Sequence, residues 1–177
     1  MRAGGERVYV ALGANLGDRE ATFSAVIRAF EREPDLQLVA ASGVYETPPL
    51  GPPGQDPYLN AVVALHAWLS PSALLERLQA IESALGRDRG PDAIRWGPRA
   101  IDLDLLLFGD RCVSLPDLEV PHPRLHERAF VLVPLADLAP RLAHPIRGGS
   151  VEDMLAAQGG HDDIVPCDRP AGWPGAR

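Results

Sequence analysis

Lysine is absent from this 177-residue chain, and all seventeen basic residues are arginines. A Walker A phosphate loop and the ATP site of a protein kinase both require a lysine ammonium group, so the sequence excludes both. Any phosphate-binding site in this protein must therefore be built from guanidinium groups, which suit recognition of two oxygens at once.

Cysteine is scarce, and long apolar runs are missing. Cys112 and Cys167 lie far apart and match no zinc or redox spacing, which predicts a reduced, cytoplasmic protein. Residues 1–7 are polar and the apolar run after them is only five residues long, so neither a signal peptide nor a transmembrane helix is expected. The net charge of −7 argues against binding to nucleic acid or to an anionic membrane surface.

The apolar patterns follow one another in the order β-α-β-β-α-β. Amphipathic helices are predicted at 19–32 and from Ser70 to Gly86, and the strands are predicted at 8–12, 36–45, 58–67 and from Ile101 onward. This is the split βαβ pattern of an α+β, ferredoxin-like sandwich with an antiparallel sheet and both helices on one face. The other face is left for ligands or additional elements.

The last third of the chain adds elements to this plan. Residues 115–123 are predicted to be extended, 125–138 to form two short helical pieces interrupted by Pro134, and 150–157 to form a short helix. We expect a single domain over residues 1–157. The segment 158–177 is rich in Gly, Pro and Asp, which predicts a poorly ordered tail.

Two acids share one face of the strand that begins at Ile101. Asp102 and Asp104 alternate with aliphatic residues, so their Cα atoms lie roughly 6.6 Å apart. Carboxylates this close repel each other, and a divalent cation turns the repulsion into ligation. Magnesium suits one or two carboxylates plus substrate phosphates, and a pair of ions can hold a phosphoryl group. Parity places Asn60 on the same face of the sheet as both acids.

Arginines and a tryptophan precede the acid pair. The positive charges that a polyphosphate needs could come from Arg87, Arg89, Arg95 and Arg99. Because these arginines lie so near the acid pair, a chance pair of solvated acids is the weaker interpretation. These residues lie in or beside loop 87–98, and a second loop at 46–57 holds five prolines and two glycines. Either loop could be a substrate lid or a passive connector.

Other residues leave alternatives open. His122 and His126 are four apart, but the prolines flanking His122 favour a phosphate, ribose or structural contact over zinc. Arg128 and Phe130 could share one ligand if their segment is extended, or could be a surface arginine and a core phenylalanine. The rings of Tyr58 and Trp96 could stack on a flat substrate, and Glu82 by itself has the pattern of a surface acid.

The motif at residues 95–104, Arg-Trp-Gly-Pro-Arg-Ala-Ile-Asp-Leu-Asp, closely resembles the signature of the 6-hydroxymethyl-7,8-dihydropterin pyrophosphokinases of folate biosynthesis. Further matches occur in the family's order between residues 7 and 157. They are Gly13-x-Asn15-Leu16, Thr47-Pro48-Pro49-Leu50-Gly51, Tyr58-Leu59-Asn60, Glu82 with Gly86-Arg87-x-Arg89, and Pro121-His122-Pro123-Arg124 through Arg128-x-Phe130.

The resemblance implies transfer of the β,γ-pyrophosphoryl unit of ATP to the hydroxymethyl group of the dihydropterin, with release of AMP. It implies that Asp102 and Asp104 hold two magnesium ions and that Arg87 and Arg99 stabilise the phosphates. Further contacts to ATP are implied for Gln79, Glu82, Arg89, Trp96, His122 and Arg128. The pterin would lie between Tyr58 and Phe130, bound by Asn60 and by the segment containing Thr47, Pro48 and Leu50.

Two departures from the family pattern are visible: Ala14 replaces a common serine, and Gly90-Pro91-Asp92 lacks the lysine of some members. The expected partners are the two small substrates alone, with a monomeric protein. An RNA-binding domain on the same plan is disfavoured by the negative charge and by the missing aromatic RNA-binding strands. A regulatory domain is disfavoured because it would have little use for an aspartate pair beside four arginines. The alternative enzyme is a metal-dependent nucleotidyl- or glycosyltransferase that uses the Asp-x-Asp pair.

Overall fold

The computed structural model describes residues 4–87, 90–91 and 97–175. A six-stranded sheet in the order β5-β1-β4-β3-β8 forms its centre, with β2 also paired to β4, and every pairing is antiparallel. The strands are β1 (Glu6–Ala14), β2 (Leu36–Ala41), β3 (Val44–Thr47), β4 (Tyr58–Ala67), β5 (Asp102–Phe108) and β8 (Val165–Cys167).

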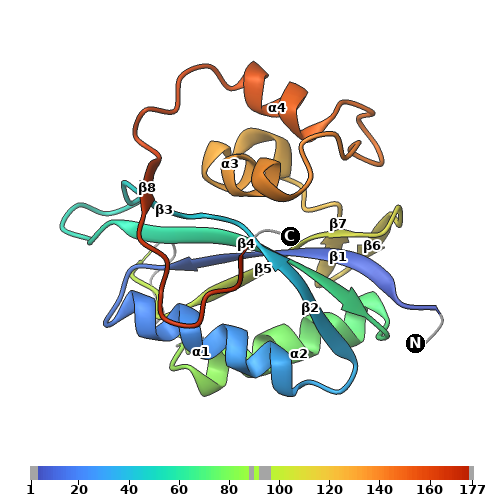
Figure 1. The fold of residues 1–177 in the computed structure, drawn as a ribbon, viewed down its shortest axis with the longest axis horizontal. Helices are drawn as coiled ribbons and strands as arrows, with labels where there is room; N and C mark the ends of the chain where they lie inside the picture. Colours follow the sequence, from blue (N-terminus) through green and yellow to red (C-terminus); the bar gives the residue numbers. More distant parts are fainter. Residues whose placement is uncertain (1–3, 88–89, 92–96, 176–177) are drawn as a thin grey trace.

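Helices cover both faces of the sheet (Figure 1). On one face lie α1 (Arg19–Arg32) and α2 (Pro71–Ala84), and on the other α3 (Ala129–Leu138) and α4 (Val151–Ala157). The first two helices confirm the ferredoxin-like plan, and the C-terminal pair is the addition to it. Among the described helices none is long and apolar enough to cross a bilayer.

Residue alternation along β4 explains why the sheet is buried on both sides. Leu59, Ala61, Val63 and Leu65 pack in the cluster that includes the apolar residues of α1 and α2, whereas Val62 and Ala64 pack with α3 and α4. Side chains of a strand point alternately to opposite faces, so one strand serves two cores. Asn60 has the parity of Val62 and therefore faces α3.

The two predicted helix starts are confirmed by their caps. The carboxylate of Asp18 accepts a hydrogen bond of 2.9 Å from the backbone N–H of Ala21 at the start of α1. The hydroxyl of Ser70 accepts one from Ala73, and Pro71 follows at the first position of α2.

The prediction of one continuous strand over residues 36–45 is wrong, because the structure has two strands there. Ser42 and Gly43 break it, so that β2 pairs with the end of β4 and β3 pairs with its beginning. A single apolar run in the sequence does not reveal this break, because it is made by pairing with β4. The break lets β3 lead toward the loop that starts at Pro48.

The C-terminal third also differs from expectation. Residues 115–123 contribute to a hairpin of β6 (Val113–Leu115) and β7 (Leu118–Val120), followed by a 3-10 turn, η1 (Leu125–Glu127). The helical pieces separate at Arg128 and not at Pro134, which lies inside α3. The burial of Val131, Leu132 and Leu135 offsets the hydrogen bond that Pro134 cannot make.

The arrangement of residues 158–175 does not fit a poorly ordered tail. This segment forms β8 on the outer edge of β3, and Trp173 is only 8% exposed. Its composition predicted disorder because Gly, Pro and Asp dominate. A few apolar side chains are nevertheless enough to hold the segment in place when they pack against a sheet edge and the core.

Candidate active site

A cavity of about 320 Å³ opens on the α3 side of the sheet, where β4, β1 and β5 lie side by side. The cavity is lined by Ala11, Leu12, Gly13, Thr47, Pro48, Leu50, Tyr58, Asn60, Ala61, Arg99, Asp102, Asp104, His122, Arg128, Phe130 and Val131. All six residues expected to bind the pterin are in this set. So are Asp102, Asp104 and three of the residues expected to bind ATP.

The sheet register explains how residues distant in the chain meet here. Gly13 of β1 lies opposite Asn60 on β4 and opposite Asp102 on β5. Adjacent strands are about 4.8 Å apart, so Asn60 and Asp102 stand roughly 10 Å from each other across β1. A flat substrate of two fused rings spans such a distance.

Small residues on β1 form the floor of the cavity, and the sequence analysis missed them. A Cβ added at Gly13 would lie 3.6 Å from Oδ1 of Asn60 and 3.8 Å from Cδ1 of Tyr58. Ala11, opposite Asp104 in the register, adds only a methyl group. The motif containing Gly13 was visible in the sequence, but its role depends on the neighbouring strands.

The polar wall next to this floor is held in place by hydrogen bonds. Nδ2 of Asn60 donates to Oγ1 of Thr47 at 2.6 Å, and both residues are buried. The hydroxyl of Tyr58 donates to the carbonyl of Gly97 at 3.2 Å, which links β4 to the segment before β5. The amide and the ring are thus oriented before any ligand binds.

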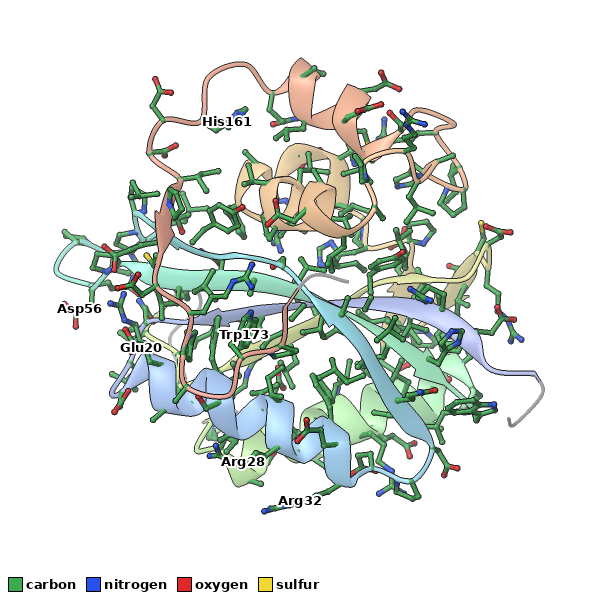
Figure 2. All side chains as sticks on the ribbon, in the orientation of Figure 1. Glu20, Arg28, Arg32, Asp56, His161 and Trp173 are labelled. Carbon is green, nitrogen blue, oxygen red and sulfur yellow. The ribbon has the colours of Figure 1, made fainter. Side chains whose placement is uncertain are left out.

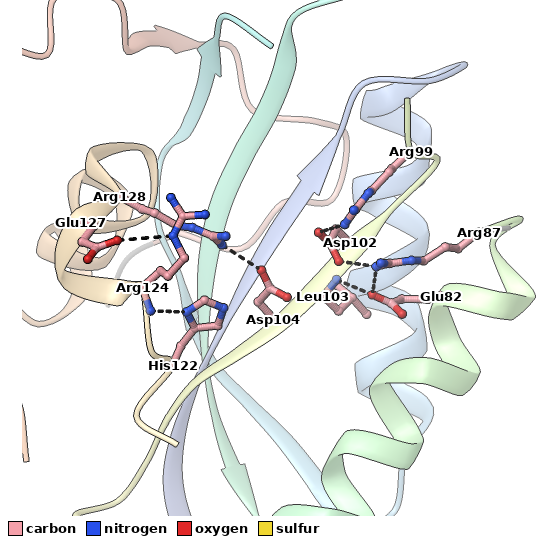
Figure 3. Close-up of polar contacts among 10 residues, drawn as sticks. All are labelled: Glu82, Arg87, Arg99, Asp102, Leu103, Asp104, His122, Arg124, Glu127 and Arg128. Atoms are coloured by element: carbon pink, nitrogen blue, oxygen red, sulfur yellow. Dashed lines mark hydrogen bonds and ion pairs between the residues drawn. The ribbon is translucent and has the colours of Figure 1, made fainter. Parts of the chain in front are cut away.

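Asp102 is bound by two arginines (Figure 3). Arg99 donates to its Oδ2 at 2.6 Å, and Arg87 donates to its Oδ1. Burial alone would raise the pKa of Asp102, but the guanidinium groups of Arg87 and Arg99 outweigh it and lower that pKa below its usual value. The carboxylate is therefore ionised at neutral pH.

Asp104 has the opposite environment. Burial, followed by repulsion from Asp102, raises the pKa of Asp104 to about 6, and its ion pair with Arg128 is long at 3.5 Å. Two carboxylates on one strand face, one of them poorly compensated, are the donor set that a hard divalent cation prefers. The described residues contain no cluster of three or more His, Cys, Asp or Glu, so the remaining ligands would have to come from substrate oxygens or water.

Glu82 is not the surface acid that its sequence position suggested. It is 1% exposed, accepts from Arg87 at 2.5 Å and from the backbone N–H of Leu103 at 2.7 Å, and lies behind Asp102 (Figure 3). The structure therefore places it among the supports of Arg87 and β5, not in the cavity wall. Periodicity along α2 could not show this, because the partner groups lie on β5 and after the helix.

His122, Arg128 and Phe130 form the wall opposite the floor. Burial, reinforced by the charge of Arg128, lowers the pKa of His122 to about 4, so the ring is neutral at pH 7. Its Nδ1 accepts from the backbone N–H of Arg124 at 3.1 Å. The guanidinium of Arg128 lies 5.7 Å from the ring centre of Phe130. Both residues line one cavity although Phe130 is helical, so their meeting does not require the extended segment that the sequence left open as a condition.

Four of the residues expected to contact ATP, Glu82 among them, do not line the cavity or cannot be placed. Gln79 is half-buried on α2 and is not part of the cavity wall. Arg89 and Trp96 lie outside the described residues.

Asn15 is a further residue whose role the sequence did not reveal. Its Oδ1 accepts from the backbone N–H of Arg99 at 2.8 Å, and its own N–H donates to the carbonyl of Arg99 at 3.0 Å. Its Nδ2 donates to Oε1 of Gln55 and to the carbonyl of Asp56. One buried amide thus joins the arginine that binds Asp102 to the proline-rich loop on the pterin side.

A ferredoxin-like sheet with a cavity that gathers paired carboxylates, arginines and aromatic rings on its α3 side defines the class: an enzyme that transfers a phosphoryl group to a flat acceptor. The sequence pattern of the family described as 7,8-dihydro-6-hydroxymethylpterin-pyrophosphokinase (HPPK) matches residues 9–140. The chain belongs to this family of ATP-dependent pyrophosphokinases. The family assignment disfavours the nucleotidyl- or glycosyltransferase alternative.

Similar proteins agree with this assignment. The chain is 51% identical to the 2-amino-4-hydroxy-6-hydroxymethyldihydropteridine pyrophosphokinase of Pseudomonas aeruginosa, over 86% of this chain and 91% of that protein. It is 43% identical to the protein of the same name from Bacillus subtilis, over 73% and 76% of the two chains. Among solved structures, wild-type HPPK-DHPS from Plasmodium falciparum shares the fold with a TM-score of 0.67 and 13% identity. The match covers 87% of this chain and 45% of that longer one.

Proposed function

We propose that ATP and 6-hydroxymethyl-7,8-dihydropterin meet in this cavity, where the β,γ-pyrophosphoryl unit passes to the pterin hydroxymethyl group and AMP is released. Family membership supports the reaction. The observation that carries the assignment of the site is that all six candidate pterin residues and both acids line one cavity.

The pterin half of the site is the part between β4 and α3. The rings of Tyr58 and Phe130 bracket the flat heterocycle, because both line the cavity and stacking on two faces orients a planar ligand. Asn60 and Thr47 supply hydrogen-bonding groups at the ring edge. Their mutual bond fixes the amide before binding, which lowers the entropy lost on complex formation.

The ATP half is the part next to β5. Asp102 and Asp104 would hold two magnesium ions. Two carboxylates fit magnesium because they would leave coordination positions for phosphate oxygens. Magnesium bound there would neutralise charge on the triphosphate and acidify the attacking hydroxyl. Among the described residues of the cavity wall, these carboxylates are the candidates for a general base, because His122 is neutral and already accepts a backbone hydrogen bond.

The arginines stand beside the position where Asp102 and Asp104 would hold magnesium. Arg87 and Arg99 both contact Asp102, and with magnesium bound there Arg99 would be able to turn to phosphate oxygens while Arg87 keeps its bond to Glu82. The long 3.5 Å pair of Arg128 with Asp104 would likewise leave Arg128 able to contact phosphate. Positioning and charge stabilisation are the main demands of phosphoryl transfer, and these side chains meet both.

The remaining assignments stay predictions from the sequence. They are ATP contacts by Gln79, Glu82, Arg89 and Trp96, a monomeric state, a cytoplasmic location, and a single domain over residues 1–157. The loop 46–57 contributes Pro48 and Leu50 to the cavity, which supports its role as a substrate loop.

Product analysis with labelled ATP tests the proposal. We expect labelled AMP only when ATP, the dihydropterin and magnesium are all present, and none after EDTA treatment. Robust turnover with another acceptor and none with the pterin would refute the substrate. Release of pyrophosphate or ADP in place of AMP would refute the reaction.

A further inference from the structure

The C-terminal segment 164–175 lies beyond the end of the family match at residue 140, and it packs along the β3 edge and the α1 face of the sheet. After α4 the chain descends along the sheet edge and adds β8 to β3 (Figure 1). Val44 pairs with Cys167 and Glu46 with Val165. Without β8, the outer edge of the four-residue β3 would have no partner strand.

Trp173 anchors the end of this segment beneath the sheet. Its ring stacks on Phe23 of α1 with a centroid distance of 5.6 Å, and it lies between the C-terminal segment and the sheet in Figure 2. In the same view Arg28 and Arg32 of α1 point away from the sheet. A second anchor is the hydroxyl of Ser24, which donates to the carbonyl of Ala171 at 2.8 Å.

The indole of Trp173 also completes the hydrogen bonding of the break between β2 and β3. Nε1 donates to the carbonyl of Ser42 at 2.9 Å, and Ser42 is fully buried. The N–H of Ser42 donates to the carbonyl of Val62, and its hydroxyl accepts from the N–H of Val62. Every polar group of Ser42 is thereby engaged, so Trp173 helps to fix the point where the chain turns into β3.

This turn sets the position of residues that line the cavity. Tyr45 pairs with Asn60 and Thr47 with Tyr58 in the register of β3 on β4. Thr47 then bonds Asn60 and is followed by Pro48 in the cavity wall. A shift of β3 would therefore move the pterin side of the cavity, whereas Asp102 and Asp104 are carried by β5 at the opposite edge of the sheet.

We propose that segment 164–175 positions β3 and, through it, the pterin half of the active site, with Trp173 as the main positioning residue. This inference rests on the proposed function, because it assigns the β3 side of the cavity to the pterin. It predicts a selective effect: loss of the anchor weakens pterin binding and spares ATP binding.

The test compares Trp173→Ala and Trp173→Phe with Phe30→Leu. The alanine variant removes both the stacking and the Nε1 hydrogen bond, and the phenylalanine variant removes only the hydrogen bond. Phe30 is fully buried seven positions after Phe23 on α1, so its variant loosens the same core but leaves in place both the stacking of Trp173 on Phe23 and its hydrogen bond to Ser42. Steady-state kinetics give KM for each substrate and kcat, and calorimetry gives the pterin Kd without turnover.

We expect Trp173→Ala to raise the pterin KM and Kd about tenfold, Trp173→Phe to raise them about threefold, and both to leave the KM for ATP within about twofold. Hydrogen exchange at residues 44–47 should accelerate in both variants. Phe30→Leu should leave the pterin KM at the wild-type value.

Three results would overturn the inference. They are an unchanged pterin KM in a folded Trp173 variant, a parallel rise for ATP and pterin, or an equal rise in Phe30→Leu. If Trp173→Ala does not fold, Trp173→Phe decides by the same criteria. Failure of the wild-type protein to form AMP from ATP and the pterin would instead reject the proposed function.

Discussion

At the scale of single residues, Asp102 and Asp104 show how two identical side chains acquire different properties. Two arginines hold the pKa of Asp102 down, whereas burial beside Asp102 raises the pKa of Asp104 to about 6. The ionised form of Asp104 is thus unfavourable in the folded protein until a cation compensates it. Such a residue is retained at a cost in stability, which is typical of function.

The prediction at this scale concerns Asp104→Asn. The amide keeps the size and removes the charge, so we expect turnover to fall at least about 100-fold while the thermal midpoint stays equal or rises. Kinetics with magnesium and a thermal melt measure the two effects. Asp117→Asn, a change in the turn between β6 and β7, is the control. Near-normal turnover in Asp104→Asn would contradict its role at the metal site.

At the scale of elements, β1 forms the floor of the cavity because its residues there, Ala11 and Gly13, have little or no side chain. Gly13 lies between Asn60 and Asp102 in the sheet, and a Cβ at this position meets only ordinary contacts. The glycine is therefore not required by crowding within the protein. Its place in the cavity wall indicates that the space above it belongs to the substrate.

We predict that Gly13→Val raises the pterin KM more than tenfold at nearly unchanged stability. The branched side chain projects into the cavity, and valine is favourable in a strand. Binding calorimetry with the pterin and a thermal melt separate the two effects, and Gly13→Ala should give an intermediate KM. Unchanged pterin binding in the valine variant would show that the substrate lies elsewhere.

At the scale of the whole molecule, the absence of lysine simplifies the response to alkaline pH. Between pH 10 and 12 tyrosines are the main titrating side chains, and the chain has three of them. Tyr45 donates to Asp137 at 2.7 Å and so connects β3 to α3. Burial, with this hydrogen bond, raises the pKa of Tyr45 to about 12.

The stability of the protein should accordingly fall above pH 10. Unfolded Tyr45 loses its proton near pH 10 and folded Tyr45 near pH 12, so the stabilisation is complete below pH 10 and is lost as pH rises through 12. Urea unfolding at pH 8, 10 and 11 measures the decline. Tyr45→Phe should flatten it, leaving a shallower fall from Tyr58, whose pKa burial also raises. An identical decline in Tyr45→Phe would contradict this account.

Features that depend on neighbours along the chain could be predicted from the amino-acid sequence alone. Alternation placed Asp102 and Asp104 on one face of β5, and capping residues placed the starts of α1 and α2. These signals are local, because strand and helix periods are properties of a few consecutive residues. The resemblance to the family added the set of candidate residues, of which the six pterin candidates, both acids, Arg99, His122 and Arg128 line one cavity.

Features that depend on partners far apart in the chain became apparent only from the folded arrangement. Glu82 can be buried because Arg87 and the backbone N–H of Leu103 on β5 donate hydrogen bonds to it. Gly13 forms part of the cavity floor because β4 and β5 lie on either side of it. Trp173 and Ser42 are separated by 131 positions, and no local pattern links them. Composition predicted a disordered tail there. Contacts with a sheet edge and a buried carbonyl gave it an ordered place, because they supply the apolar and hydrogen-bonding partners that the tail itself lacks.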